Sequence, residues 1–249
     1  MDTGGEDISG GCGQYNIGIL IILALDTTTS AGSAAVLRDG DVLAESIGDP
    51  AVTHGQRLPA DLDRVLRDAA LRIEDVEVFA VAAGPGSFTG LRVGIATTQG
   101  LATAGSRRVF PVSALDALAR AAVNPQAPIA AWMDAHRGQV FSQVYAANGV
   151  DVLSPREAAL PAALLEAWYV REGDATPVFI GDGAVRYHAE IRARFGGGVT
   201  IVEPPPLAPI IGRMAAERPD GAVLPHAVVP IYIRKPDAEL ARIRRLAGA

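Results

Sequence analysis

The chain has 249 residues, of which 49% are hydrophobic and 20% are charged, and its formal net charge is −6. This composition is typical of a packed globular protein, and the length fits one large domain or two lobes. The negative charge excludes a broad basic field, which argues against tight autonomous binding of nucleic acid.

The N-terminal residues are not expected to form a membrane span or a secretion signal. The apolar run 17–25 is shorter than the about 20 residues that a membrane helix needs. Residues 1–16 contain no Lys or Arg, whereas a signal peptide begins with a basic segment. We therefore expect 1–16 to be a disordered leader.

Cys12 is the only cysteine, so no intramolecular disulfide or cysteine-based zinc site can form, which suits a cytoplasmic protein.

The first half of the chain predicts a strand meander followed by alternating helices and strands. Short apolar runs predict strands at 19–25, 33–37, 42–47, 78–83 and 109–112. Asp39-Gly40 is a hairpin turn signal between the second and third of these. A helix is expected with Pro59 in its first turn, and its buried face is predicted to contain Leu62, Val65, Leu66 and Ala69. Another is expected after Ser113, with Asp116 at the capping-box position.

The pattern begins again after 124–128 (NPQAP), which is the expected boundary between two lobes. Strands are predicted at 129–133, 140–145, 150–153, 178–180 and 199–202. Ser154-Pro-Arg-Glu157 has the capping-box pattern and predicts a helix to about residue 170. Further helices are expected after Gly183, as far as Phe195, and over 210–217.

Two lobes that each open with a strand meander predict an α/β architecture, with mixed sheets covered by helices. This is the organisation of the actin-like ATPase fold, which Hsp70 and the sugar kinases share. We place the N-terminal lobe at 17–123 and the C-terminal lobe at 124–235, followed by a basic tail at 236–249.

Residues 84–102 (GPGSFTGLRVGIATTQGLA) form a glycine-rich turn that leads directly into a helix. A Rossmann fingerprint requires glycine at its sixth position, which is Thr89 here. A P-loop requires Gly-Lys-Ser/Thr, and Lys235 is the only lysine in the chain. A tight turn and a buried helix are therefore favoured over a phosphate-binding loop. Residues 93–106 carry no charge, so this helix needs partner surfaces on nearly every side.

Five stretches together resemble the TsaB (YeaZ) family. They are 23–36 (LALDTTTSAGSAAV), 53–59 (THGQRLP), 84–102, 132–141 (WMDAHRGQVF) and 230–234 (PIYIR). The resemblance implies an actin-like fold without an active site of its own. It also implies pairing with TsaD, which transfers threonylcarbamoyl from its adenylate to the adenosine beside the anticodon of tRNA. An ATPase, TsaE, joins that complex. The chain itself needs no cofactor on this view, and ATP or ADP and a divalent metal are expected on the partner.

Candidate catalytic residues are few. TsaD-like proteins hold a metal through two histidines four residues apart on a helix, and the matching segment 112–119 (VSALDALA) contains none. We therefore predict no catalytic and no metal-binding residue. Asp134 and His136 could form a catalytic pair, but a turn held by local hydrogen bonds is favoured. His54 is predicted to be a helix-start or packing residue. The alternative function is an active small-molecule kinase or ATPase of the actin-like fold.

A residual nucleotide site is predicted from the resemblance to the actin-like fold. Actin-like ATPases place an aspartate and a glycine-containing turn around the phosphates, and this chain has Asp26 followed by Thr27 and two more threonines. On the adenosine side, the usual pair of adjacent glycines is replaced by Gly181, Asp182 and Gly183. Asp182 would bring a negative charge near a nucleotide, so hydrolysis is not expected.

A partner interface is predicted on the helix that we place at 91–104. At 3.6 residues per turn, Leu91, Ile95, Thr98 and Ala102 should face the sheet. The opposite face is small and uncharged, and contains Val93, Ala96, Thr97, Gly100 and Ala104. We expect this face to bind TsaD, or a second copy of the chain in a homodimer when TsaD is absent.

The tail carries Arg234, Lys235, Arg242, Arg244 and Arg245. A solvated C-terminal helix is the favoured interpretation of this cluster. A contact with tRNA phosphates or with an acidic partner is the other.

Overall fold

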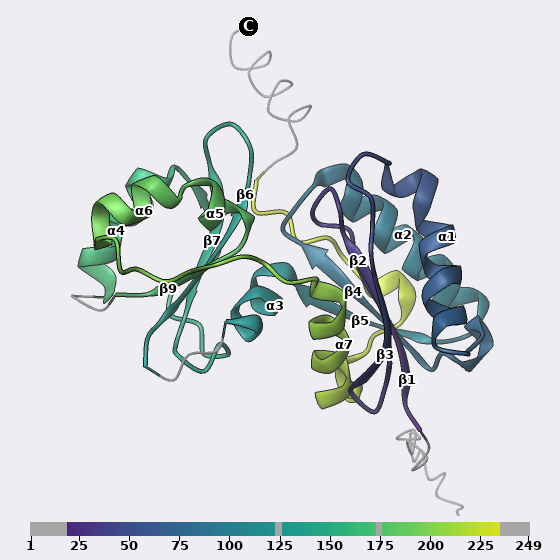
Figure 1. Ribbon diagram of the computed structural model, residues 1–249. Coiled ribbons are helices and arrows are strands. Elements are labelled where there is room, and N and C mark those ends of the chain that lie inside the picture. The colour runs from purple at the N-terminus through teal and green to yellow at the C-terminus, as the bar shows by residue number, and fades with distance from the viewer. Residues whose placement is uncertain (1–18, 123–125, 173–175, 235–249) are drawn as a thin grey trace, which may run out of the picture.

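The computed structural model describes residues 19–122, 126–172 and 176–234. Within these residues, two five-stranded sheets stand side by side with helices against their faces (Figure 1). The first sheet has the order β3-β2-β1-β4-β5 and contains β1 (Ile21–Asp26), β2 (Ser33–Arg38), β3 (Asp41–Ile47), β4 (Val78–Gly84) and β5 (Arg108–Ser113). The second has the order β8-β7-β6-β9-β10 and contains β6 (Ile129–Asp134), β7 (Val140–Tyr145), β8 (Glu157–Ala159), β9 (Val178–Ile180) and β10 (Ile201–Val202).

The two sheets have the same connectivity. In each, the first three strands form an antiparallel meander, and the first strand of the meander pairs in parallel with the fourth, which pairs in parallel with the fifth. A duplicated lobe with this strand order is the actin-like fold, so the predicted fold class is confirmed.

The helices form three layers around the two sheets (Figure 1). One face of the first sheet is covered by α1 (His54–Asp68) and α2 (Phe88–Ala104). Between the two sheets lie α3 (Ala114–Ala121) and α7 (Leu207–Glu217). The second sheet is covered on its outer side by α4 (Pro161–Glu172), α5 (Asp182–Arg186) and α6 (His188–Phe195). Short 3₁₀ helices occur at η1 (Ile73–Asp75), η2 (Pro219–Gly221) and η3 (Pro225–Ala227).

The strand β1 lies at the centre of the first sheet and is buried on both faces, which explains why the first apolar run of the sequence is continuous. Because side chains alternate along a strand, Leu23 and Leu25 pack under α1 and α2, whereas Ile22 and Ala24 pack against the layer between the sheets. Every residue of β1 is buried, as expected for a strand with helices on both faces. Asp26, the last residue of this strand, is therefore buried as well.

The C-terminal lobe differs from the predicted 124–235. After β10 the chain leaves the second sheet, and α7 packs on β1 and β2 of the first sheet. Val223 then pairs with Val109 of β5, and the Ile231 N–H donates to the Ala83 carbonyl at 2.7 Å. The apolar face of α7 covers the side of the first sheet that α1 and α2 leave open, which explains the return. The predicted boundary at residue 124, the leader 1–16 and the tail 236–249 lie outside the described residues.

The predicted strand 150–153 is wrong, and the helix predicted from Ser154 to about residue 170 begins later than expected. The third strand of this meander is β8, and α4 begins only at Pro161. The Ser154 Oγ accepts a hydrogen bond from the Val144 N–H at 2.9 Å, so this hydroxyl ties the segment before β8 to β7 and caps no helix. Glu157 pairs with Ser142 in β8. A tertiary contact has therefore overridden a local capping pattern.

Two smaller predictions about helix starts are also wrong. Pro59 was predicted in the first turn of its helix, but α1 begins at His54 and Pro59 lies further inside it. The helix is preceded by Thr53, whose N–H donates to the Gln56 side chain at 3.3 Å. Asp116 lies in the first turn of α3 as predicted, but its carboxylate accepts from the Tyr145 hydroxyl at 2.6 Å and pairs with Arg156. The Asp116 side chain therefore ties α3 to the second sheet and forms no capping box.

Candidate functional site

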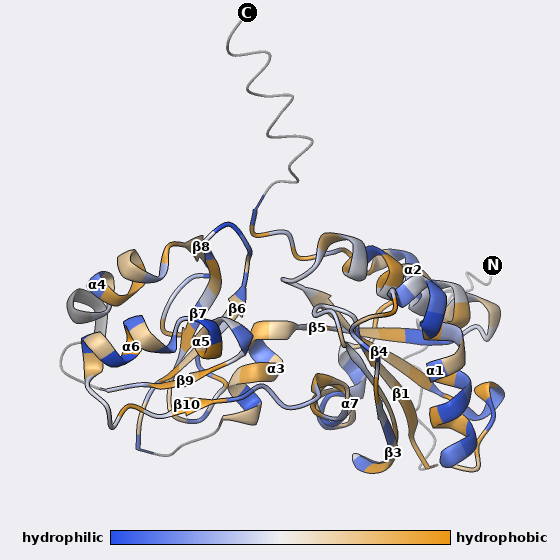
Figure 2. Ribbon diagram, turned by 45° about the horizontal axis from the view of Figure 1, so that its top comes forward, coloured by the Kyte–Doolittle hydropathy of each residue, from blue (hydrophilic) through white to orange (hydrophobic). Residues whose placement is uncertain are grey.

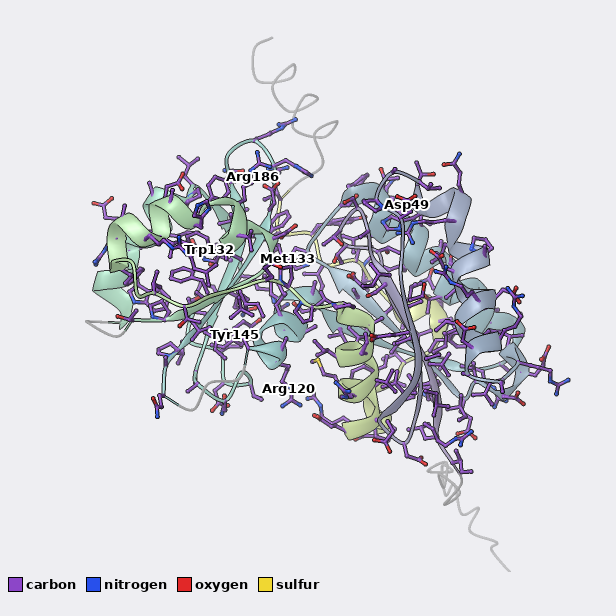
Figure 3. All side chains as sticks on the ribbon, viewed as in Figure 1. Asp49, Arg120, Trp132, Met133, Tyr145 and Arg186 are labelled. Atoms are coloured by element: carbon purple, nitrogen blue, oxygen red, sulfur yellow. The ribbon has the colours of Figure 1, made fainter. Side chains whose placement is uncertain are left out.

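A cavity of about 300 Å³ lies between the two lobes, at the ends of β1 and β9. Asp26 reaches it from the end of β1, and Asp182 reaches it from the start of α5. Met133 also lines it, on the opposite face of β6 from Trp132, as the side chains of Figure 3 show. The other lining residues are mostly apolar or small and include Ile47, Leu118, Leu207 and the prolines 204–206.

Asp26 is a buried carboxylate with local hydrogen bonds only. Its Oδ1 accepts from the Thr28 N–H at 2.8 Å and from the Thr28 hydroxyl at 2.6 Å, and the residue is 3% exposed. Burial raises the pKa of the Asp26 carboxyl above its usual value of 3.8, although the bonds from Thr28 act in the opposite direction. The charge of Asp182 adds to the increase.

Asp182 is the second carboxylate of the cavity. Its Oδ1 accepts from the N–H of Asp134 at 3.0 Å and from the N–H of Gly183 at 2.9 Å. Burial raises the pKa of this carboxyl too, and these backbone bonds lower it. Two carboxylates thus face one cavity, and its described lining residues include no Lys, Arg or His. An anionic ligand would therefore meet negative charge there, without a cationic side chain to balance it.

The other three predicted nucleotide-site residues do not line this cavity. The Thr27 hydroxyl donates to the Gly90 carbonyl of α2 at 2.8 Å, and the residue is 1% exposed. A Cβ at Gly181 or Gly183 would overlap the backbone of β6 around Trp132 and Met133, so these two glycines allow close packing of α5 on β6. Thr27 therefore packs under α2, on the far side of its strand end from the cavity.

The turn after β1 is held by α1. The Thr29 carbonyl accepts from His54 Nε2 at 2.8 Å, and Arg57 donates to the Ala31 carbonyl. Arg57 also lies 2.9 Å from His54 Nδ1, so this nitrogen is the acceptor and the Nε2–H tautomer is assigned. His54 thus fixes the turn to the helix, as predicted for a packing residue. Arg57 was missed, because no local sequence pattern indicates that its guanidinium reaches a turn far away in the sequence.

We expect Asp26→Asn to raise the melting temperature. A carboxyl whose pKa is raised in the folded state does not lower the free energy of unfolding below pH 3.8. As the pH rises from 3.8 toward the folded-state pKa, the carboxyl lowers this free energy progressively, and the loss is complete above that pKa. Asn keeps the acceptor for Thr28 but carries no buried charge. The gain should be at least about 2 °C near pH 8 and should shrink toward pH 4. Differential scanning calorimetry at both values tests this, with exposed Asp41→Asn as the control. A lower melting temperature at the higher pH would contradict it.

The structure places the residues of α2 as predicted for the sheet side. Leu91, Ile95, Thr98 and Ala102 are all buried against the first lobe. On the opposite face Ala96, Gly100 and Ala104 are exposed, and Val93 and Thr97 are partly exposed. Apart from the adjoining turns of α2 itself, no atom of the described residues lies within 4 Å of a Cβ added at Gly100. Gln99, at the side of the helix, donates to the carbonyls of Pro225 and Val228, so the C-terminal segment covers that side and leaves the small-residue face open.

The helix α3 contains no histidine, and Leu118 of this helix lines the cavity instead. Among the described residues, no group of three or more His, Cys, Asp or Glu side chains could hold a metal ion. His136 and Asp134 lie 3.6 Å apart in the turn after β6, where the Asp134 carboxylate also accepts from the His136 N–H and from Arg186. They thus form the locally bonded turn that was favoured. No helix in the described part of the chain is long and apolar enough to cross a membrane.

Comparison with known proteins identifies the family. A family model described as TsaD, tRNA N6-adenosine threonylcarbamoyltransferase, matches residues 49–173. An uncharacterized protein of Mycobacterium tuberculosis is 33% identical over 223 residues, which are 89% of this chain and 95% of that protein. The tRNA threonylcarbamoyladenosine biosynthesis protein TsaB of Bacillus subtilis is 29% identical over 225 residues, 88% of this chain and 96% of TsaB.

A solved structure gives the same answer. It is a Pseudomonas aeruginosa protein described as similar to the peptidase YeaZ, with a TM-score of 0.69 and 28% identity. The alignment covers 86% of this chain and 100% of the Pseudomonas aeruginosa protein. With these matches over most of its length, the chain belongs to the TsaB/YeaZ family of tRNA threonylcarbamoyladenosine biosynthesis proteins, which is related to TsaD.

Proposed function

We propose that this chain is a non-catalytic subunit that binds TsaD and supports its transfer of threonylcarbamoyl to the adenosine beside the anticodon of tRNA. The open face of α2 is the observation that carries the proposal. It is formed by Val93, Ala96, Thr97, Gly100 and Ala104. These residues are small or apolar and uncharged, whereas a helix face exposed to solvent normally carries charged or polar residues. Small side chains allow another helix to approach closely, so this face suits a helix of TsaD.

The absence of an active site in this chain is supported by several residues. No histidine stands on α3, and Thr27 packs under α2, away from the cavity between the lobes. The described lining of the cavity between the lobes contributes two carboxylates and no cationic side chain for a nucleotide. We therefore assign ATP or ADP and the divalent metal to the partner, and a residual nucleotide site at most to Asp26 and Asp182.

The proposed assembly also contains TsaE and, through the complex, tRNA, in the cytoplasm and without a membrane contact. In the absence of TsaD, the same face of α2 would join two copies of this chain. Gel filtration with light scattering, on this chain mixed with TsaD of the same organism, tests the pairing. We expect a homodimer alone and a heteromeric complex after mixing. Separate elution at concentrations well above micromolar would contradict the proposal.

The alternative function is a small-molecule kinase or ATPase. It is favoured by one observation, the position of Asp26 and Asp182 on either side of the cavity between the lobes. We predict that the isolated chain releases no phosphate from ATP, because the cavity lining offers no cation to a triphosphate. A steady-state phosphate-release assay with added Mg²⁺ tests this. Turnover of about 1 per second or more, abolished by Asp26→Ala, would establish the alternative.

A further inference from the structure

The cavity between the two lobes combines its two carboxylates with apolar walls. Its volume of about 300 Å³ is at the lower end of the range for small-molecule sites. In Figure 2 the strands β1 and β9, which lead to the cavity, consist mostly of apolar residues. Met133, Leu118, Leu207 and Ile47 line the cavity. A ligand that fills it would therefore bury hydrocarbon as well as charge.

Within the described residues, each carboxylate of the cavity has one oxygen without a hydrogen bond. Asp26 is 3% exposed, and its hydrogen bonds, both from Thr28, go to Oδ1. Asp182 also accepts through Oδ1. In the part of the chain that the structure describes, the Ser113 Oγ is the only enclosed side-chain oxygen or nitrogen that lacks a partner. The two Oδ2 atoms are unbonded but not enclosed, so they are open to the cavity that these side chains line.

An unbonded oxygen on a buried carboxylate indicates a missing donor. Buried polar groups in folded proteins nearly always have a hydrogen-bond partner, and a buried charge is costly unless it is paired. Burial raises the pKa of both carboxyls, as expected for charges without a counter-charge. A ligand that carries a positive charge and N–H donors would satisfy both requirements.

Two arginines near the cavity already have acidic partners. Arg57 contacts the turn after β1 from the side of α1 and pairs with Asp61. Arg186 pairs with Asp134 at 2.8 Å. Neither arginine is among the described lining residues. The positive charge that the two open oxygens lack must therefore come from a ligand.

The donor set distinguishes between kinds of cation. Ca²⁺ and Mg²⁺ take about six oxygen ligands or more. Among the described residues, no group of three or more His, Cys, Asp or Glu side chains could hold a metal ion. A primary ammonium group instead presents three N–H donors, and two open carboxylate oxygens accept two of them. The apolar wall then suits a hydrocarbon chain attached to the nitrogen.

We propose that the cavity between the lobes binds a primary aliphatic amine. Its ammonium group donates to the Oδ2 atoms of Asp26 and Asp182, and its hydrocarbon chain packs on Met133, Leu118 and Leu207. Because Asp26 belongs to the first lobe and Asp182 to the second, the ammonium group joins the two lobes. The proposal goes beyond the pairing with TsaD and does not depend on it.

Isothermal titration calorimetry with n-butylamine and the isolated chain tests the proposal. The titration is done near pH 8, where the amine is protonated, and at about 20 mM salt, where charge pairs are weakly screened. We expect saturable binding of one amine per chain. n-Butanol has the same hydrocarbon chain without the charge, whereas the ammonium ion and Mg²⁺ have the charge without the chain. All three should bind at least about tenfold more weakly than n-butylamine.

Asn variants test which carboxylates hold the amine. Asp26→Asn and Asp182→Asn should each weaken n-butylamine binding at least about tenfold, because each replaces a charged acceptor by a neutral one. The matched control is the double variant Asp41→Asn, Asp63→Asn, which removes two exposed carboxylates of the first lobe. It should bind n-butylamine as the parent chain does. Circular dichroism confirms that each variant is folded.

Four results would overturn the proposal. They are no saturable binding up to about 10 mM n-butylamine, an equal loss in the control, binding of n-butanol as tight as that of the amine, and tighter binding of Mg²⁺ or ATP that Asp26→Asn abolishes. The last result would establish a metal or nucleotide site instead. Pairing with TsaD is measured separately, so a failure of the amine site and a failure of the proposed function are distinguishable.

Discussion

Gly90→Ala is expected to destabilise the chain by about 3 kcal/mol or more, which lowers the melting temperature by about 6–12 °C. A Cβ at this position would lie 2.1 Å from the Thr27 carbonyl oxygen. The carbonyl belongs to the backbone and the Cβ is fixed to the backbone of α2, so neither can turn aside and α2 would have to move away from the end of β1. Gly100→Ala is the matched control in the same helix, since no atom lies within 4 Å of its Cβ. It should leave stability unchanged or increase it by about 0.5–1 kcal/mol.

A partner substitution shows which atom causes the clash. A Cβ at Gly94 would lie 2.1 Å from the Thr27 hydroxyl oxygen, and Gly94→Ala should therefore be destabilising as well. Thr27→Ala removes that oxygen, so the double variant Thr27→Ala, Gly94→Ala should recover part of the loss. Gly90→Ala should not be rescued in this way. Chemical denaturation of the three single variants and of Thr27→Ala combined with Gly94→Ala or with Gly90→Ala measures the coupling. Equal stability of Gly90→Ala and Gly100→Ala would show that α2 does not pack on Thr27.

Gly100→Arg is expected to abolish the pairing with TsaD while the chain stays folded. The added side chain places bulk and charge at the centre of the open α2 face but touches nothing on the sheet side. Affinity for TsaD should fall at least about tenfold, equivalent to about 1.4 kcal/mol, and the homodimer should become a monomer. Gel filtration with light scattering measures both, with circular dichroism as the folding control.

Gly197→Arg is the matched control for this variant. It adds the same side chain to the second lobe, where no atom lies within 4 Å of the new Cβ and the backbone has no positive φ. It should bind TsaD as the parent chain does. If Gly100→Arg still captured TsaD and stayed dimeric, the interface would lie on another surface.

The sequence predicted those elements best whose signals are local or continuous. β1 and β4 are fully buried, and their uninterrupted apolar runs indicated strands. Asp39 and Gly40 have the positive φ values of a tight hairpin turn, as the dipeptide predicted. The buried side of α2 was predicted from helical periodicity alone, because that side depends only on spacing along one helix.

Features that depend on distant contacts could not be predicted in this way. The Ser154 hydroxyl bonds to β7, which no pattern of neighbouring residues indicates. Asp26 and Asp182 do line one cavity, but Thr27 packs under α2, because the position of that helix depends on Gly90 and Gly94. A cavity between the N-terminal end of α2, the β6–β7 turn and residues 231–234 was missed altogether, since its walls come from three separate segments.

Reconstituted tRNA modification tests the central claim most directly. TsaD of the same organism, threonylcarbamoyl-adenylate and unmodified tRNA are incubated with no addition, with this chain, with Gly100→Arg and with Gly197→Arg, and the modified adenosine is measured by mass spectrometry. We expect that modification depends on the chain, is lost with Gly100→Arg and persists with Gly197→Arg, and that the chain without TsaD modifies nothing. Full modification by TsaD alone, or modification by this chain alone, would contradict it.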